Sequence, residues 1–316
     1  SDSSVDPKIA FRYQASDELA LRASFSTSFR EASLAQLTST NISLQGIQDY
    51  NADGSAKGGT AFIRIAQANN PNLAPEESDN MNIGAMWKPS DKLSMTLDYW
   101  AIDYTNVITI ESAQGKVAAN PLDPDVKRTA GGTLTGVTTK YFNAANVNTS
   151  GLDFESTYDF DTSFGQAQVG VNMMHMLEYE IPLNGVTTDV VGLFNHDNFA
   201  RSMPETKAVF HAALQNGNNR LSMFGRYISD YRTTRPLDAI AKARGFSQSI
   251  DSFFTVDLMD AYTIEMNDSE LKLSVGITNL FDEEVPLVYD AANWSYDSKH
   301  HDPRGRMVYV GFKLSR

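Results

Sequence analysis

Two neighbouring histidines stand out among the side chains that could contact a ligand. His300 and His301 closely follow Trp294 and Tyr296, so imidazole nitrogens and aromatic rings share one short stretch. Small-molecule pockets are commonly lined by aromatic rings with a few polar groups, and this combination fits the edge of such a pocket. A solvated loop tip would have a similar composition. We therefore predict a ligand contact here, with the loop tip as the alternative.

A basic stretch upstream is the second candidate. Tyr231, Arg232 and Arg235 are followed by Lys242 and Arg244, although the whole chain carries a net charge of -13. Local positive charge attracts anionic ligands. The same arginines would equally suit pairing with acidic loops nearby or with the phosphates of lipopolysaccharide. The stretch therefore predicts either a ligand contact or one of these two pairings.

Residues 49–54, Asp-Tyr-Asn-Ala-Asp-Gly, match the first half of a calcium-binding loop. In such a loop, oxygen ligands come from alternate positions and a glycine occupies the sixth. Asp49, Asn51 and Asp53 would be the ligands of a structural Ca²⁺ ion. The twelfth position is Thr60 rather than glutamate, so the match is incomplete. A plain turn rich in Asn, Asp and Gly is the alternative.

Nothing in the sequence predicts catalysis. The chain has no cysteine, which excludes a thiol nucleophile and thiolate metal sites. No local motif brings Ser, His and Asp together as a nucleophilic triad. A pI near 4.8 argues against nucleic acid as a partner, because phosphate binding needs an excess of Lys and Arg. We therefore predict that the protein is not an enzyme and that no cofactor is required.

Alternating apolar and polar residues define the elements that position these side chains. In the last strand, one face carries Val308, Val310, Phe312 and Leu314, and the other carries Met307, Tyr309, Gly311 and Lys313. The same period recurs along the whole chain and predicts about eleven strands of about ten residues or more. No run of about 18 apolar residues is present, so a transmembrane helix is excluded.

The predicted connections alternate between tight turns and long loops. The long loops are roughly 31–76, 109–141, 178–203, 232–251 and 281–303. Short turns at one end and long loops at the other are typical of a transmembrane antiparallel β-barrel, whose wall is apolar outside and polar inside. The fold class is therefore predicted as all-β. A soluble solenoid or sandwich is the alternative, but loops this long at every second connection are unusual there.

Several segments resemble TonB-dependent outer-membrane transporters. Asn-Leu-Phe-Asp at 279–282 and Pro-Arg at 303–304 precede the final strand, in the order found at the C-terminus of that family. Residues 28–37 resemble its "FRAP" box, with Glu-Ala in place of Ala-Pro, and 70–76 resemble its "NPNL" box. Residues 146–155 resemble the entry into a later strand. These matches extend over the whole chain.

The resemblance implies a 22-stranded barrel, of which residues 1–316 would be the C-terminal half, with about eleven strands. The plug domain and the first barrel half would then lie outside this chain, which would start within an extracellular loop that is cleaved or disordered. The implied partners are that N-terminal half, the TonB complex through the plug, and outer-membrane lipid and lipopolysaccharide. Polar side chains on the wall, among them Arg12, Arg22 and Asn82, are expected to face the plug.

The function that the resemblance implies is active uptake of a scarce large solute across the Gram-negative outer membrane. The solute is left open among a siderophore, cobalamin, a glycan and a peptide. Haem is disfavoured, because 33–69, between the two boxes, contains no histidine. The alternative function is a barrel that serves as a surface platform for a secreted protein, a capsule or a surface layer.

Overall fold

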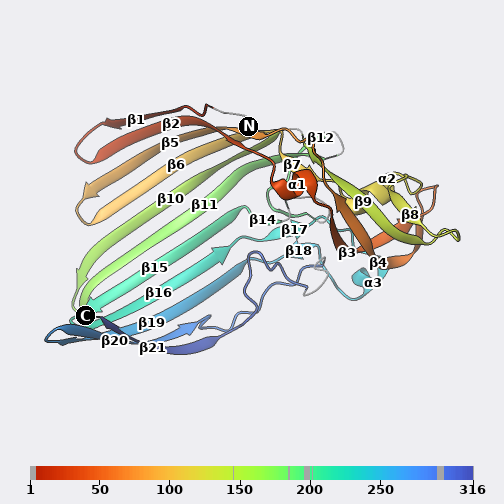
Figure 1. Ribbon diagram of the computed structural model, residues 1–316. Helices are drawn as coiled ribbons and strands as arrows, with labels where there is room; N and C mark the ends of the chain where they lie inside the picture. Colours follow the sequence, from red (N-terminus) through yellow and green to blue (C-terminus); the bar gives the residue numbers. More distant parts are fainter. Residues whose placement is uncertain are drawn as a thin grey trace.

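The computed structural model describes residues 5–144, 146–183, 186–195, 200, 202–289 and 295–315. Its main element is an antiparallel sheet whose strands follow one another almost in chain order (Figure 1). These strands are β1 (Lys8–Gln14), β2 (Leu19–Arg30), β5 (Glu76–Ser90), β6 (Leu93–Thr105), β10 (Val147–Thr162), β11 (Gly165–Leu183), β15 (Thr206–Asn216), β16 (Asn219–Ile228), β19 (Phe253–Met266), β20 (Ser269–Thr278) and β21 (Met307–Ser315). A short strand, β12 (Val186–Asp189), extends the end of β11. The prediction of about eleven wall strands is confirmed.

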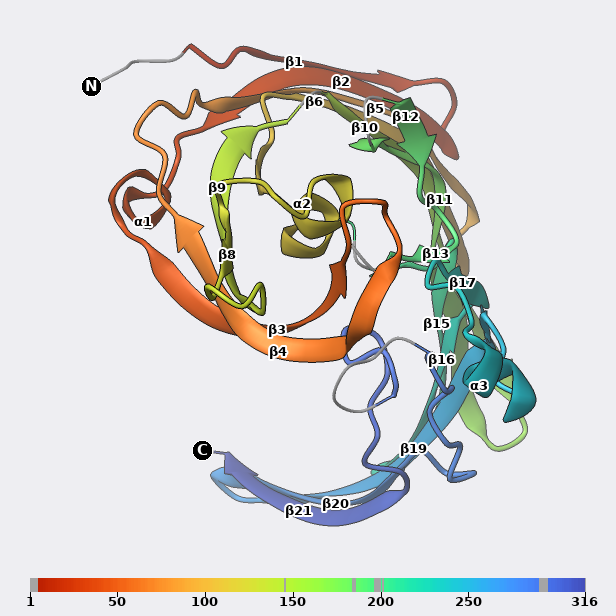
Figure 2. The ribbon, with the colours of Figure 1, turned by 90° about the vertical axis from the view of Figure 1, so that its right-hand side faces the viewer.

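The sheet curves into an arc that is open between β1 and β21 (Figure 2). At one end its strands are joined by tight turns, such as Ala15–Glu18 between β1 and β2. At the other end the chain makes long excursions before it returns to the next strand. This alternation is the one predicted from the sequence.

One face of the sheet is apolar and the other is polar, because the strand register places apolar residues opposite apolar residues and polar residues mostly opposite polar ones. One row runs through Phe11, Ala23, Ile83, Tyr99 and Leu152 on five neighbouring strands. The adjacent row, on the opposite face, runs through Arg12, Arg22, Gly84, Asp98, Asp153, Met174, Lys207 and Ile228. On β21 the apolar face is very open, with Val310 82% and Phe312 83% exposed. The apolar face is therefore suited to lipid and the polar face to an aqueous interior.

The first two long loops fold together into a structured body, here called the loop module (residues 34–68 and 108–143). It contains α1 (Leu34–Thr38), β3 (Asn41–Tyr50), β4 (Ala56–Ala68), β7 (Ile108–Ile110), α2 (Ala113–Ala119), β8 (Val126–Arg128) and β9 (Leu134–Asn143). Its sheet has the order β3-β4-β9-β7, with β8 also paired to β9. The link between the two loops is the parallel pair β4 and β9.

The loop module has its own apolar core. Ile47, Ile65, Val117 and Val137 are each at most 1% exposed and belong to one cluster. α2 closes this core, and Ser112 caps the start of the helix by accepting a hydrogen bond from the Gly115 backbone N–H. The sequence predicted these segments only as loops, because the pairing of β4 with β9 joins strands that are far apart in the chain.

A second small sheet lies at the long-loop end beside β15 to β19. It has the order β14 (Ser202–Met203), β13 (Leu193–Phe194), β17 (Tyr231–Thr233) and β18 (Ser249–Ile250), and the helix α3 (Ala239–Ala243) follows β17. Phe194, Tyr231, Ile250 and Val288 form its core, so the last long loop contributes Val288 to it.

Among the described residues, no helix is both long and apolar enough to cross a membrane.

Candidate functional site

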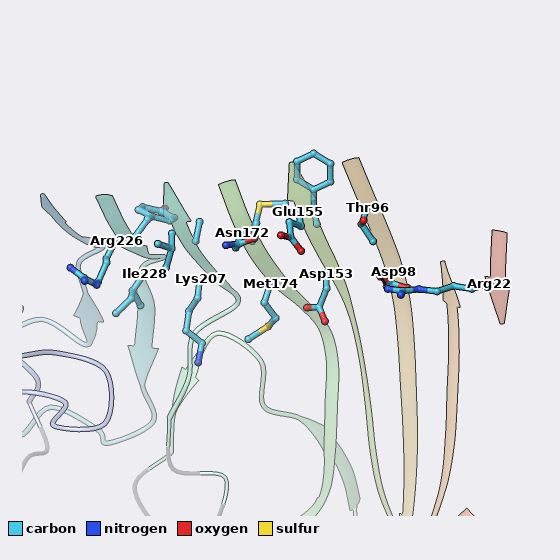
Figure 3. Close-up of a pocket in the computed structure, with 15 residues that line it drawn as sticks. Arg22, Thr96, Asp98, Asp153, Glu155, Asn172, Met174, Lys207, Arg226 and Ile228 are labelled. Carbon is cyan, nitrogen blue, oxygen red and sulfur yellow. Dashed lines mark hydrogen bonds and ion pairs between the residues drawn. The ribbon is translucent and has the colours of Figure 1, made fainter. Parts of the chain in front are cut away.

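The polar face of the wall forms a pocket of about 560 Å³. Figure 3 shows side chains from neighbouring strands lying side by side along it. The charged and amide groups that line it are Arg22, Asp98, Asp153, Glu155, Asn172, Lys207 and Arg226. Each comes from a strand position whose two neighbours along the chain point to the apolar face, so period-two alternation alone places them together.

Two ion pairs fix part of this pocket. The Arg22 guanidinium donates through Nε to Asp98 Oδ1 at 2.8 Å and through a second nitrogen to Oδ2. Arg226 donates through Nη1 alone, to Asp257 Oδ2 on the next strand. In contrast, Asp153 and Glu155 have no ion pair with the described residues. The negative charges of these two carboxylates are therefore not neutralised by a described basic side chain.

The predicted plug-facing residues all lie on this polar face. Arg12 is directly opposite Arg22 in the register, and Asn82 is opposite Ser24 on one side and Trp100 on the other. Their position on the wall agrees with the prediction, whereas contact with a plug stays a prediction.

The second candidate site is a buried cluster where the last long loop meets the small sheet. Asp297 is 2% exposed, and its Oδ2 accepts hydrogen bonds from Tyr231 Oη at 2.7 Å and from the Ser202 hydroxyl. Its Oδ1 accepts from the Lys299 backbone N–H at 3.0 Å. The His301 ring packs against the rings of Tyr231 and Phe253, with centroids 6.2 and 5.1 Å away.

The electrostatics of this cluster follow from burial and hydrogen bonding. Burial raises the pKa of Tyr231, and the neighbouring Asp297 carboxylate raises it further. Burial alone would raise the pKa of Asp297, but hydrogen bonds from Ser202 and Tyr231 outweigh it and lower this pKa overall. The cluster at neutral pH therefore consists of a carboxylate held by neutral hydroxyl donors.

The structure brings only some of the sequence-predicted ligand residues together. Tyr231 and His301 meet in the buried cluster, and His300 Nε2 lies 3.4 Å from the Ser202 carbonyl oxygen. Tyr296 is half-buried nearby in sequence, whereas Trp294 lies outside the described residues.

Two of the arginines of the basic stretch, Arg232 and Arg235, are engaged elsewhere. Arg232 donates to Gln248 Oε1 at 3.0 Å, and the Arg235 guanidinium lies 5.4 Å from the centre of the Tyr289 ring. The sequence analysis singled out neither Ser202 nor Asp297, because nothing local signals that either is buried.

The residues of the calcium-like pattern are arranged in a way that does not fit a calcium ion. Asp49 is bound by the Arg128 guanidinium, with Nη1 to Oδ2 at 2.8 Å and Nη2 to Oδ1 at 2.5 Å. Asp53 Oδ1 accepts from the Ser55 backbone at 2.9 Å, and Asn51 donates to the Ser55 hydroxyl at 3.0 Å. Within the described part of the chain, no three His, Cys, Asp or Glu side chains are grouped to hold a metal. A calcium site here stays a prediction that this geometry disfavours.

Comparison with known structures finds a similar fold in two bacterial siderophore receptors and an iron transporter. A ferric enterobactin receptor of Pseudomonas aeruginosa (the G324V mutant of PfeA) has a TM-score of 0.65 and 17% identity; the match covers 98% of this chain and 40% of that one. The siderophore receptor PirA of Acinetobacter baumannii has a TM-score of 0.62 and 14% identity, over 97% and 40% of the two chains. The FrpB iron transporter of Neisseria meningitidis has a TM-score of 0.56 and 13% identity, over 98% and 38%.

At these identities the likeness concerns the fold. The chain spans about 40% of the length of the solved structures it matches. No curated protein sequence matches it. The family model described as "TonB dependent receptor-like, beta-barrel" matches residues 1–280. The chain therefore belongs to the family of TonB-dependent receptors, and its sheet of eleven long strands forms part of the β-barrel wall that defines this family.

Proposed function

We propose that this chain is the C-terminal half of a 22-stranded transporter that takes up a scarce large solute across the Gram-negative outer membrane. The observation that carries the proposal is the wall itself. It is apolar on one face, polar on the other, and bears structured loops at one end only. Such a wall suits an aqueous interior that is loaded from one side of the membrane.

The edges of the sheet support a partner that completes the barrel. Among the described strands, β1 pairs only with β2, and β21 pairs only with β20. Unpaired backbone N–H and C=O groups are costly in lipid, so a membrane sheet with two free edges needs further strands. The N-terminal half of the same receptor, with its plug, is the partner we propose. The TonB complex would act through that plug.

The solute we favour is a ferric siderophore. Structural neighbours are described as ferric enterobactin and siderophore receptors. In this chain, exposed Arg232 and half-buried Arg235 give the loop end a local positive charge that suits an anionic complex. We propose these two arginines, with Trp294, Tyr296 and His300, as the ligand-contacting region of the chain. Tyr231 and His301, each 4% exposed, would support this region from below the surface.

Growth under iron limitation tests the transport function. Strains that lack the receptor gene, or TonB, are supplied with single ferric siderophores as the iron source, and with cobalamin or glycans as the limiting nutrient in parallel. We expect one ligand to support growth only when both receptor and TonB are present. A surface phenotype that depends on the receptor but not on TonB would instead establish the platform function.

A charge variant tests the ligand region. Arg232→Ala combined with Arg235→Ala should weaken binding of an anionic ligand, measured by titration of the whole purified receptor. Arg220→Ala is the matched control, because Arg220 lies on the polar face at the short-turn end of β16. Equal loss of affinity in the control would contradict a site at the basic stretch.

A further inference from the structure

His301 is buried in an environment that provides no hydrogen-bond partner for its ring. The residue is 4% exposed, and neither Nδ1 nor Nε2 has a partner among the described residues. Its ring packs between the rings of Tyr231 on β17 and Phe253 on β19. An imidazole that is neutral tolerates such a place at the cost of one unsatisfied donor and one unsatisfied acceptor. A protonated imidazole would bring a full charge and a second N–H donor into it.

His301 belongs to the segment that Asp297 fastens to the small sheet. The backbone N–H of His301 donates to the Asp297 carbonyl oxygen at 3.0 Å, so the ring and the carboxylate belong to one turn. The Asp297 carboxylate is already engaged and is a poor acceptor for a hydrogen bond from a protonated His301 ring. Its Oδ2 accepts from Tyr231 and Ser202, and its Oδ1 accepts from the Lys299 backbone.

We propose that His301 holds the last long loop, through residues 295–302, against the small sheet in a way that depends on pH. While its ring is neutral, residues 295–302 stay docked on β14, β17 and β19, and protonation of the ring releases them. The docked segment lies next to the wall, since the His301 ring packs against Phe253 at the start of β19, and the charge of Lys207 on β15 helps to lower the pKa of His300. Release would therefore change access from outside to the polar face near Lys207. The proposal does not depend on which solute is transported.

The charged and titratable groups around the ring act in opposite directions. Asp297 favours the protonated ring, whereas burial and the neighbouring His300 disfavour it, and the pKa of His301 is lowered overall. The pKa of His300 is also lowered, first by burial and then by Lys207, with Lys299 adding to the effect and Asp297 opposing it. Tyr231 is neutral at these pH values, and Phe253 carries no charge.

The sign of the pH effect follows from this direction. Above pH 6.5, the ordinary pKa of histidine, the His301 ring is neutral in both the docked and the released form, so docking has its full stability. Below it the released form binds a proton more tightly than the docked form, and docking weakens as the pH falls. Each unit by which burial lowers the pKa gives about a tenfold preference of the proton for the released form.

A spin label on the segment measures its release. The chain has no cysteine, so Ser298→Cys, at an exposed position between Asp297 and Lys299, gives this chain one labelling site. The labelled whole receptor is titrated from about pH 7.5 to about pH 5, a range in which histidine changes charge. We expect an immobile label at the upper end and a growing mobile fraction below the ordinary histidine value. A label at Leu122→Cys, on the loop module, should not respond.

Two variants assign the effect to His301. His301→Phe keeps an aromatic ring without a titratable group, and it should hold the label immobile over the whole range. His300→Gln should leave the response in place. The proposal is overturned by a wild-type label that never becomes mobile, by a response that persists in His301→Phe, or by one that disappears in His300→Gln. Phenylalanine itself could prevent docking, and the label in His301→Phe would then be mobile at every pH. In that case the pH dependence of label mobility in the wild-type sequence is the test, and release that begins above pH 6.5, the ordinary pKa of histidine, overturns the proposal.

Discussion

At the scale of single residues, the side chains with unusual environments are few and lie where two segments meet. Asp297 is buried and receives two hydroxyl donors from the small sheet. Glu76 is 9% exposed and accepts from Arg30 and, at 2.7 Å, from the Ile108 backbone N–H. Each of these carboxylates joins a loop to the rest of the receptor, because a buried charge is stable only where donors converge on it.

The Tyr231 hydroxyl can be tested by a single change. Tyr231→Phe leaves one Asp297 oxygen with a single hydroxyl donor, and loss of a hydrogen bond to a charged group costs about 1.5–3 kcal/mol. We expect faster hydrogen exchange at the backbone N–H groups of His300 and His301, which donate to the Asp297 carbonyl oxygen. Tyr296→Phe is the control, because the Tyr296 hydroxyl makes no hydrogen bond with the described residues. Unchanged exchange in Tyr231→Phe would show that the Ser202 hydroxyl suffices.

The sequence could predict which residue types are able to bind but not which of them are buried. His301 and Tyr231 were singled out by type, and they meet in one cluster. Asp297 and Ser202 are far apart in the chain, and only the packing of the small sheet brings them together. The sequence could not show that Asp49 pairs with Arg128 for the same reason, because Arg128 comes from a different loop.

At the scale of elements, the loop module behaves as a small domain attached to the wall. Its core consists of aliphatic side chains from β3, β4, β8, β9 and α2. Two side chains connect the module to the ends of the wall strands. Glu76 accepts from the Ile108 backbone N–H. The Asn143 side-chain amide donates to the carbonyl oxygens of Ala74 and Asn106 at 2.8 and 2.7 Å. We therefore expect changes in its core to unfold the module without unfolding the wall.

Ile65→Ala tests the independence of the module. Ile65 is 1% exposed, and truncation of a buried isoleucine to alanine costs about 2–5 kcal/mol. Limited proteolysis should cut the variant within the module, while the barrel keeps its resistance to unfolding in detergent. Ile42→Ala is the control, since Ile42 is 63% exposed on the same hairpin. If the wall of Ile65→Ala melts together with the module, the two are one cooperative unit.

At the scale of the whole molecule, the two faces of the wall predict opposite tolerance to charge. Val275 and Ser274 are neighbours on β20 and lie on the apolar and polar faces, respectively. Val275→Arg should hinder assembly, because an arginine on the lipid face costs about 2–4 kcal/mol near the bilayer midplane. Ser274→Arg should assemble normally. The fraction of receptor that resists unfolding in cold detergent measures both, and equal yields would mean that β20 does not face lipid.

Most of the wall could be predicted from the sequence, because each strand carries its own period-two pattern and pairs with its neighbour in the chain. Val308 to Leu314 on β21 showed it clearly. The loop module could not be predicted, because its strands come from two separate loops and its central contact is parallel, between Arg64 on β4 and Gly136 on β9. Local pattern contains no information about such distant pairing.

That parallel pair also has a consequence for the order in which the receptor is built. Two wall strands, β5 and β6, lie between β4 and β9 in the chain, so the pairing of β4 with β9 closes a long segment. Contacts between distant segments form late, because closing a long loop has an entropic cost. Until β9 is in place, the edge of β4 that binds it and the apolar face of β3 and β4 lack their cover. We therefore expect proteases to cut this hairpin more readily in a receptor that has not yet folded than in the finished protein.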